Sequence, residues 1–403
     1  MSKAKRQPET PAAKLDLNNT AIAFASLSDQ QLRQAIFLFK VIGSPLVVKL
    51  GPTFADLSLK LRLPIQGLIK KTIFSHFCGG ETIPDCLPRI EQLGTKSVGT
   101  ILDFAREGGG QEEDFDLVTK EIIRTIDMAA QHRKLIPFAV FKPTGVASLD
   151  LLAKTDRGDV LTIDEQAAFA RVKGRFEAIC EHAAKKRVRI MIDAEESWIQ
   201  KTVDTLAMEL MARLNQEQAI VSNTIQLYRH DRLDFIKSCL ATAQAQNFYL
   251  GFKLVRGAYL EKENDHAAEE GRPSPINPTK EATDREYNEA LKFCVSNLDR
   301  IAFCAGTHNE ASVRLLVDLM AQHQIEPHDE RIHFAQLLGM SDNISFNLAA
   351  AGYLVAKYVP YGTVGELLPY LTRRAQENSS VLGQSSRELD LLNREYARRK
   401  TAK

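Results

Sequence analysis

The sequence VRIMIDAEE at residues 188–196 is an apolar run that ends in a cluster of acidic residues. A short run of this kind, rich in β-branched residues, is typical of a strand that is buried on both faces. A helical pattern precedes it, opened by the capping-box spacing of Thr162 and Glu165, and a polar turn and a second helical pattern follow it. The stretch therefore predicts a strand between two helices, as in a parallel α/β fold.

The same pattern recurs along the chain and predicts eight strands, at residues 97–104, 136–142, 188–193, 219–227, 248–256, 300–305, 331–334 and 354–359. Because a helical pattern separates most of these runs, the alternation indicates a closed parallel (βα)8 barrel of the TIM type. An open, doubly wound sheet is the alternative. No predicted strand is followed by a GxGxxG turn, and the glycine run at residues 108–110 has the wrong spacing and acidic neighbours, which disfavours dinucleotide binding of that type.

The composition is that of an ordinary soluble globular protein. The chain has 403 residues, of which 44% are hydrophobic and 26% charged, and its 52 Lys and Arg residues nearly balance 51 Asp and Glu residues. A balanced charge gives no long-range attraction to nucleic acid. No apolar run approaches the ~20 residues of a membrane span. The N-terminus resembles neither a secretory signal nor an acid-free transit peptide. Six dispersed cysteines suit a reducing, cytoplasmic location.

The regions outside the barrel pattern define four expected segments. Residues 1–20 are predicted to be disordered, residues 21–95 to form a helical arm, residues 96–390 to form the barrel, and residues 391–403 to form a tail. Within the arm, the capping-box spacing of Ser28 and Gln31 predicts the start of a helix. Residues 259–285 fit the alternation poorly, and their charged start suits either a mobile active-site loop or a surface loop without function.

Ionisable residues gather at the predicted strand ends, where the chemistry of such barrels takes place. Lys142 ends the second strand and Asp193 the third, so we expect the two to pair, either structurally or to hold the lysine toward an anion. Lys253 and Arg256 are three residues apart on the fifth strand and should point to opposite sides, one toward the barrel mouth. His308 could be a base, a cofactor ligand or a helix cap. The spacing of the other histidines and the cysteines predicts no metal site.

After the last strand, Pro369 suits the first position of a helix. On that helix Tyr370, Arg373, Arg374 and Glu377 would share one face, because they lie at positions i, i+3, i+4 and i+7. Two neighbouring guanidiniums on one face can bind a carboxylate, although such a pair is usually solvated.

Taken together, the motifs resemble those of the flavin-dependent proline dehydrogenases. In chain order the matching segments are FKPT (141–144), IDAEE (192–196), LVRGAY (254–259), GTHN (306–309), YVPYG (358–362) and YLTRRAQEN (370–378). The resemblance runs from about residue 97 to residue 390 and is closest to the stand-alone enzymes. It implies a distorted barrel whose last helix lies over the mouth, with FAD bound noncovalently at the strand ends.

The resemblance also implies roles for individual residues. It assigns the proline carboxylate to Lys142, Arg373 and Arg374. The residues that it implies for shaping the substrate pocket are Asp193, Tyr259, Leu337, Tyr358 and Tyr370. The residues that it implies for binding FAD are Gln226, Lys253, Arg256, Gly257, Ala258, Thr307, His308 and Glu377, the last of which would also order the pocket. Lys253 stands where some relatives have arginine, which retains the charge but not the bidentate geometry.

The activity that the resemblance implies is oxidation of L-proline at C5 by hydride transfer to flavin N5, which gives Δ1-pyrroline-5-carboxylate. A quinone would reoxidise the flavin, which implies peripheral contact with the inner membrane. Hydroxyproline oxidation is the nearest alternative, and the bulky Tyr358 favours proline. Two other hypotheses stay open at this stage: an aldolase that forms a Schiff base on Lys142 or Lys253, and a ligand-binding protein without turnover.

Overall fold

The computed structural model describes residues 15–42, 73–106, 110–380 and 384–402, and describes no side chain between residues 375 and 386. The strands are β1 (Val98–Phe104), β2 (Phe138–Phe141), β3 (Arg189–Ile192), β4 (Val221–Gln226), β5 (Leu250–Val255), β6 (Ile301–Gly306), β7 (Ile332–Leu337) and β8 (Val355–Tyr361). The main helices around them are α7 (Glu112–Gln131), α9 (Leu149–Arg157), α10 (Ile163–Lys186), α11 (Ser197–Leu214), α12 (Arg232–Gln246), α14 (Lys280–Ser296), α15 (Glu310–Gln322) and α16 (Asp342–Ala350). The remaining helices are α1 (Thr20–Ala23), α2 (Asp29–Ile42), α5 (Ser75–Phe77), α6 (Ile83–Gly94), α8 (Pro143–Val146), α13 (Leu260–Glu269), α17 (Val364–Ser380) and α18 (Gln384–Thr401).

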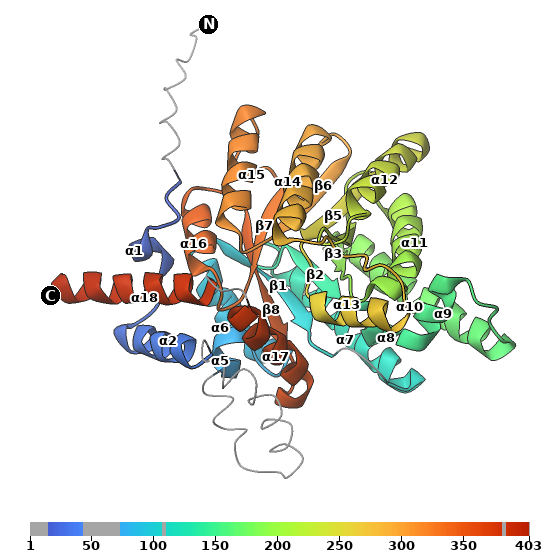
Figure 1. Cartoon of the computed structure of the whole chain (residues 1–403), viewed down its shortest axis with the longest axis horizontal. Coiled ribbons are helices and arrows are strands. Elements are labelled where there is room, and N and C mark those ends of the chain that lie inside the picture. The colour runs from blue at the N-terminus through green and yellow to red at the C-terminus, as the bar shows by residue number, and fades with distance from the viewer. Residues whose placement is uncertain (1–14, 43–72, 107–109, 381–383, 403) are drawn as a thin grey trace, which may run out of the picture.

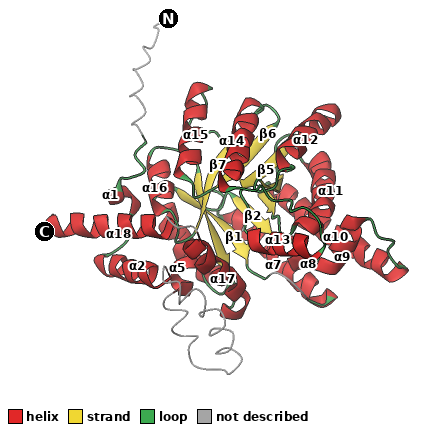
Figure 2. Cartoon of the chain, in the orientation of Figure 1, coloured by secondary structure: helices red, strands yellow, loops and turns green. Residues whose placement is uncertain are grey.

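All eight predicted strands are present, and they form one closed parallel barrel in chain order. Closure occurs between β1 and β8, which pair over seven residues from Val98 with Val355 to Phe104 with Tyr361. The helices surround the strands (Figures 1 and 2). The barrel architecture is therefore confirmed and the open doubly wound sheet is excluded. In a barrel of this kind the carboxyl ends of all the strands meet at one mouth.

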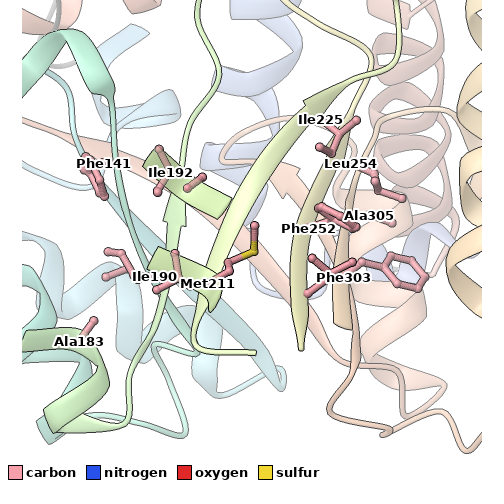
Figure 3. Packing of buried hydrophobic residues seen from close by; sticks show 14 of the residues in the cluster. Phe141, Ala183, Ile190, Ile192, Met211, Ile225, Phe252, Leu254, Phe303 and Ala305 are labelled. Carbon is pink, nitrogen blue, oxygen red and sulfur yellow. The ribbon is translucent and has the colours of Figure 1, made fainter. Parts of the chain in front are cut away.

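Side chains along each strand alternate between two layers of the core, one between the strands and the helices and one inside the barrel. Ile190 and Ile192 pack outward against the helices, together with Phe141 and Ala183 (Figure 3). Met191, between the two isoleucines, belongs instead to the cluster inside the barrel. Side chains of successive strand residues point to opposite faces, so an apolar run supplies both layers. This explains why the strands lack the apolar–polar alternation of a half-exposed sheet.

Two helix starts that the sequence predicts are confirmed by reciprocal capping bonds. The Thr162 hydroxyl accepts a hydrogen bond from the Glu165 N–H at 3.2 Å, and the Glu165 carboxylate accepts one from the Thr162 N–H at 2.9 Å. Ser28 and Gln31 form the same pair of bonds at the start of α2. Each pair satisfies two backbone donors that a helix leaves unpaired at its N-terminus.

The two ends of the chain form a second apolar cluster beside the barrel. Helices α1, α2, α5, α17 and α18 supply it, and α18 packs along α2 (Figure 1). Residues 391–403, expected as a tail, instead continue α18 as far as Thr401, because Leu391 and Leu392 are buried in this cluster. The expected disorder of residues 1–20 also ends early, since Leu17 is fully buried. Residues 1–14 and 43–72 of the predicted N-terminal segments lie outside the described residues.

The segment after β5 is a helix, not a loop. Glu263 of α13 is fully buried, and its carboxylate accepts hydrogen bonds from the backbone and hydroxyl of Ser197, at the first turn of α11. The run of charged residues therefore includes one residue that fixes the helix to the barrel. Within the described residues, no helix is long and apolar enough to cross a membrane.

The helix after β8 starts earlier than predicted. Helix α17 begins at Val364, and Thr363 and Glu366 cap its first turn with bonds of 2.8 and 3.4 Å. Pro369 therefore lies inside the helix and not at its first position. A proline inside a helix has no N–H to donate to the carbonyl four residues earlier, which here is that of Gly365.

Candidate active site

A set of paired charges crosses the mouth of the barrel and is centred on Asp193. The Asp193 carboxylate accepts hydrogen bonds from the Lys253 ammonium, from the Tyr358 hydroxyl at 2.7 Å and from the Thr224 hydroxyl at 3.4 Å. The Lys253 ammonium also lies 4.7 Å from the centre of the Tyr358 ring. Strands β3, β5 and β8 are thus joined through a single carboxylate.

The pairing of Lys142 differs from the prediction. Its ammonium binds Asp103 of β1 and not Asp193. Because β2 lies between β1 and β3, a carboxylate on either neighbour could reach Lys142, and Asp193 is already bonded to Lys253. Asp103 is a site residue that the analysis of strand ends missed. The signal was present, since a carboxylate within an otherwise apolar strand needs a partner as much as a lysine does.

Tyr358 lies between the two carboxylates. Burial, followed by the nearby Asp103 and Asp193, raises the pKa of the Tyr358 phenol well above its ordinary value. The phenol therefore stays protonated and acts as a hydrogen-bond donor. Beside it, the half-buried Leu337 at the end of β7 packs against both the barrel interior and the apolar cluster that contains Tyr370. Leu337 thus connects the barrel mouth to α17.

Arg256 points away from Lys253, as the three-residue spacing predicts. Its guanidinium donates to Asp284 at 2.8 Å, to the Thr307 hydroxyl at 2.7 Å and to the Ser312 hydroxyl at 2.9 Å. Thr307 also accepts from the Asn309 N–H at 3.1 Å. These bonds hold Arg256 along the rim between β5 and β6, where its charge lies next to the start of α15.

The turn that follows Arg256 depends on a glycine. Gly257 has a φ of +139°, and a Cβ built on it would lie 2.5 Å from the Tyr228 ring. Any L-residue with a side chain would be strained in this conformation and would collide with the ring. Gly257 and Ala258 are both exposed, so the backbone of this turn is open at the rim of the mouth.

Replacing Gly257 with Ala is expected to displace this turn and to lower the melting temperature. The strained backbone alone costs on the order of 1–3 kcal/mol. The matched control is Gly174→Ala in α10, where an added Cβ meets nothing within 4 Å and should stabilise the helix by roughly 0.5–1 kcal/mol. Thermal unfolding of both variants checks the prediction, and equal melting temperatures for the two would contradict it.

His308 is half-buried at the end of β6, where its Nδ1 lies 2.9 Å from the Ser341 hydroxyl. Burial and then the charges of Lys357, Arg374 and Arg256 lower the pKa of His308 to about 3. The imidazole is therefore neutral at physiological pH. Of the roles left open by the sequence, the helix cap is excluded, because Asn309 caps α15 with its own side chain.

Gln226 is held beside Asp193 by the backbone that follows β3. Its side-chain amide donates to the Glu195 carbonyl at 2.7 Å, while its buried Oε1 has no hydrogen-bond partner among the described residues. The Glu195 carboxylate in turn accepts from the backbone and hydroxyl of Thr144, at 2.8 and 2.6 Å. A buried acceptor without a partner is costly, which points to a ligand donor at this position.

Helix α17 follows β8 and brings one of its arginines to the segment after β5. The Arg373 guanidinium lies 5.5 Å from the ring of Tyr259, which follows β5, and the Arg374 guanidinium lies 5.1 Å from the ring of Tyr370. Arg374 is nearly buried. The structure thus brings Arg373, Arg374, Tyr259 and Tyr370 to the same end of the barrel as Asp193. The side chain of Glu377 lies outside the described part of the chain.

The residues present fit the flavin that the sequence implies. Gln226 offers a buried acceptor for an amide-type donor, and Lys253 and Arg256 supply positive charge on opposite sides of the β5 end. Such charges suit a ring system that becomes anionic on reduction and a pyrophosphate. Over the described residues, no three His, Cys, Asp or Glu side chains are grouped as they would be in a metal site.

These features define a (βα)8-barrel enzyme whose mouth holds paired charges under a helix that carries two arginines. A family profile described as "Proline dehydrogenase" matches residues 86–387. The chain belongs to the proline dehydrogenase family. It is an enzyme of that class.

Three curated relatives span most of the chain. Proline dehydrogenase 1, mitochondrial, of Dictyostelium discoideum is 32% identical over 432 residues, which cover 96% of this chain and 75% of that protein. The carbapenem antibiotics biosynthesis protein CarD of Pectobacterium carotovorum subsp. carotovorum is 35% identical, with 83% and 86% covered. The hydroxyproline dehydrogenase of Xenopus laevis is 30% identical, with 93% and 88% covered.

The fold is also similar to that of solved structures. The structure of proline utilization A from Bdellovibrio bacteriovorus inactivated by N-propargylglycine superposes with a TM-score of 0.71 at 20% identity. The match covers 91% of this chain and 38% of that longer chain. At this identity the likeness supports the barrel fold and nothing more specific.

Proposed function

We propose that this protein oxidises L-proline to Δ1-pyrroline-5-carboxylate with FAD as its cofactor and passes the electrons to a quinone. The observation that carries the proposal is that Arg373 and Arg374 of α17 lie beside the rings of Tyr259 and Tyr370, while Lys142 pairs with Asp103 at the end of β1. Two neighbouring arginines and a lysine at strand ends suit a carboxylate, and the aromatic rings of Tyr259 and Tyr370 suit the apolar pyrrolidine ring. Family membership supports the same substrate.

The protein's own residues bind and orient the substrate. Arg373, Arg374 and Lys142 would hold the proline carboxylate, and Tyr259, Leu337 and Tyr370 would enclose its ring. Fixing the carboxylate would hold the ring in one orientation, so the reaction would become an oriented step within one complex. The protonated Tyr358 cannot accept the amine proton, because its pKa is raised and its hydroxyl already donates to Asp193.

The candidate residues for holding the cofactor surround this position. Gln226, Lys253, Arg256, Gly257, Ala258, Thr307, His308 and Glu377 would bind FAD. When bound, FAD supplies the acceptor for the hydride that leaves C5 of proline. Asp193 keeps Lys253 paired and oriented toward the mouth. Because quinones are lipid-soluble, transient contact with the inner membrane forms part of the proposal.

The visible absorption spectrum of the purified protein tests this proposal. Flavin bands should be present and should bleach when L-proline is added without oxygen, and a soluble quinone should restore them. Formation of Δ1-pyrroline-5-carboxylate is detected by its adduct with o-aminobenzaldehyde. A colourless protein that takes up no FAD would overturn the cofactor assignment, and flavin that no imino acid bleaches would overturn the reaction.

The relative that is named a hydroxyproline dehydrogenase makes trans-4-hydroxy-L-proline the second candidate substrate. The buried Tyr358 ring narrows the mouth beside Leu337, which favours proline. Replacing Tyr358 with Ser is expected to move the ratio of kcat/KM for proline over hydroxyproline toward hydroxyproline by roughly tenfold or more. Steady-state kinetics with both substrates measure this ratio. A ratio that stays unchanged in the variant would show that Tyr358 does not set specificity.

A further inference from the structure

The turn between β7 and α16 is fixed by elements that are far apart in the sequence. The fully buried Lys357 of β8 donates to the Met340 carbonyl and pairs with Asp342 at 2.8 Å. His76 of α5 bonds to the Gly339 carbonyl at 2.9 Å through Nε2. The turn therefore lies at the junction between the barrel and the apolar cluster formed by the two ends of the chain.

Ser341, the last residue of this turn, connects the C-terminal helix to the candidate cofactor site. Its N–H donates to the Glu388 carboxylate of α18 at 3.1 Å, and its hydroxyl lies 2.9 Å from Nδ1 of His308. Its carbonyl accepts from the Ile344 N–H at 3.0 Å. Ser341 has a φ of +51°, an uncommon conformation for serine that persists only where surrounding contacts impose it.

We propose that Glu388 is a positioning residue, which orients the His308 imidazole toward the mouth of the barrel through Ser341. Glu388 is 7% exposed and its carboxylate holds the Ser341 backbone, while the Ser341 hydroxyl bonds Nδ1 of His308 and so fixes the orientation of the ring. The role of the oriented imidazole in binding FAD rests on the proposed function. The orientation itself does not depend on it.

The charges around Glu388 set the conditions of the test. Burial and the neighbouring Asp342 carboxylate raise the pKa of Glu388 to about 7, while Lys357 and the Ser341 and Asp342 N–H groups act in the opposite direction. The measurements are therefore made at pH 8, where most of the carboxylate is ionised. His308 is neutral at that pH because its own pKa is lowered to about 3.

Four variants separate positioning from general stability. Glu388→Ala removes the bond to the Ser341 backbone, and Glu388→Gln retains an acceptor for it. Ser341→Ala removes the hydroxyl that faces His308 and retains the backbone bond. The matched control is Glu395→Ala, two turns further along α18, because Glu395 is also buried but bonds Arg398 and Arg399 and not the turn.

The first readout is the ¹⁵N spectrum of the full-length protein with labelled histidine, in which His308→Gln identifies the His308 signals. We expect the same His308 signals in the wild-type protein and in Glu395→Ala. Glu388→Ala and Ser341→Ala should each shift the His308 signals, and Glu388→Gln should restore them toward the wild-type position. An unchanged His308 signal in Glu388→Ala would overturn the proposal, and so would an equal shift in Glu395→Ala.

The second readout separates flavin release from unfolding in a thermal ramp. Trp198 is the only tryptophan and reports unfolding by its fluorescence, whereas the fluorescence of released flavin reports loss of the cofactor. In Glu388→Ala and in Ser341→Ala, flavin should be released several degrees below the unfolding temperature. The double variant Glu388→Ala/Ser341→Ala should release flavin at about the same temperature as each single variant. Glu395→Ala should move both transitions together. Purified protein without flavin would refute the proposed function, while the ¹⁵N spectrum would still decide the positioning role.

Discussion

Replacing Arg374 or Arg373 with Met is expected to raise KM for L-proline at least about 30-fold, because each loss leaves part of the substrate carboxylate without its partner. Removal of one member of a buried charge pair costs about 2 kcal/mol or more. The nearly buried Arg374 should show the larger effect, since its interaction is less screened by water. Steady-state kinetics of both variants, each saturated with FAD, provide the measurement.

A substrate without a carboxylate supplies the control for this prediction. Pyrrolidine keeps the ring and the amine, so the two variants should oxidise it about as well as the wild-type protein does. The matched protein control is Arg394→Met in α18, which removes an exposed arginine and should leave the kinetics with proline unchanged. If both Arg373→Met and Arg374→Met retained the wild-type KM for proline, the carboxylate site would have to lie elsewhere.

Replacing Asp193 with Asn should have the largest effect on stability among the site residues. It leaves the Lys253 ammonium, 12% exposed, without its counter-charge and weakens the bond from the Tyr358 hydroxyl. Breaking a buried ion pair by removing one partner costs on the order of 3–5 kcal/mol. We expect a marked fall in melting temperature and a kcat at least about tenfold lower, measured by calorimetry and by single-turnover reduction.

The double variant Asp193→Asn/Lys253→Met tests whether Asp193 and Lys253 stabilise the fold as an ion pair, because it removes both charges. Its loss of stability should be smaller than the sum of the two single losses. Asp204 of α11, which pairs with Arg232 at 2.7 Å and is also buried, is the matched control. Asp204→Asn should destabilise the fold comparably while kcat per bound flavin stays at the wild-type value. Additive losses at Asp193 and Lys253 would contradict the pairing.

The eight strands and most of the helices that separate them are predictable from the sequence because their causes are local. A short apolar run such as residues 188–193 is typical of a strand buried on both faces, and its alternation with helical patterns indicates a covered parallel sheet. Thr162 with Glu165, and Ser28 with Gln31, mark helix starts because the bonds that they form join residues three apart. The resemblance of the strand-end motifs supplied the family, which the match over residues 86–387 confirms.

Segments without a clear local pattern were predicted less well. The charged stretch after β5 forms α13 because Glu263 finds a buried partner in Ser197, and that contact joins residues 66 positions apart. The C-terminal residues form α18 because Leu391 and Leu392 pack in the apolar cluster that includes α2. Most other residues of this segment are polar, so its sequence does not indicate a buried side. In both cases the partner of a side chain, and not its own sequence context, determines the structure.

The sequence by itself determined the barrel, the order of its strands and the gathering of Lys142, Asp193, Lys253 and Arg256 at one end. Only the tertiary structure decided how those charges pair, with Lys142 on Asp103 and Lys253 on Asp193. It also decided that Glu388 reaches the turn beside His308. A strand forms where several consecutive residues can be buried, and a run of apolar residues in the sequence indicates this. The choice among several partners within reach depends on distances of a few ångströms between separate strands, and these exist only after the barrel has closed.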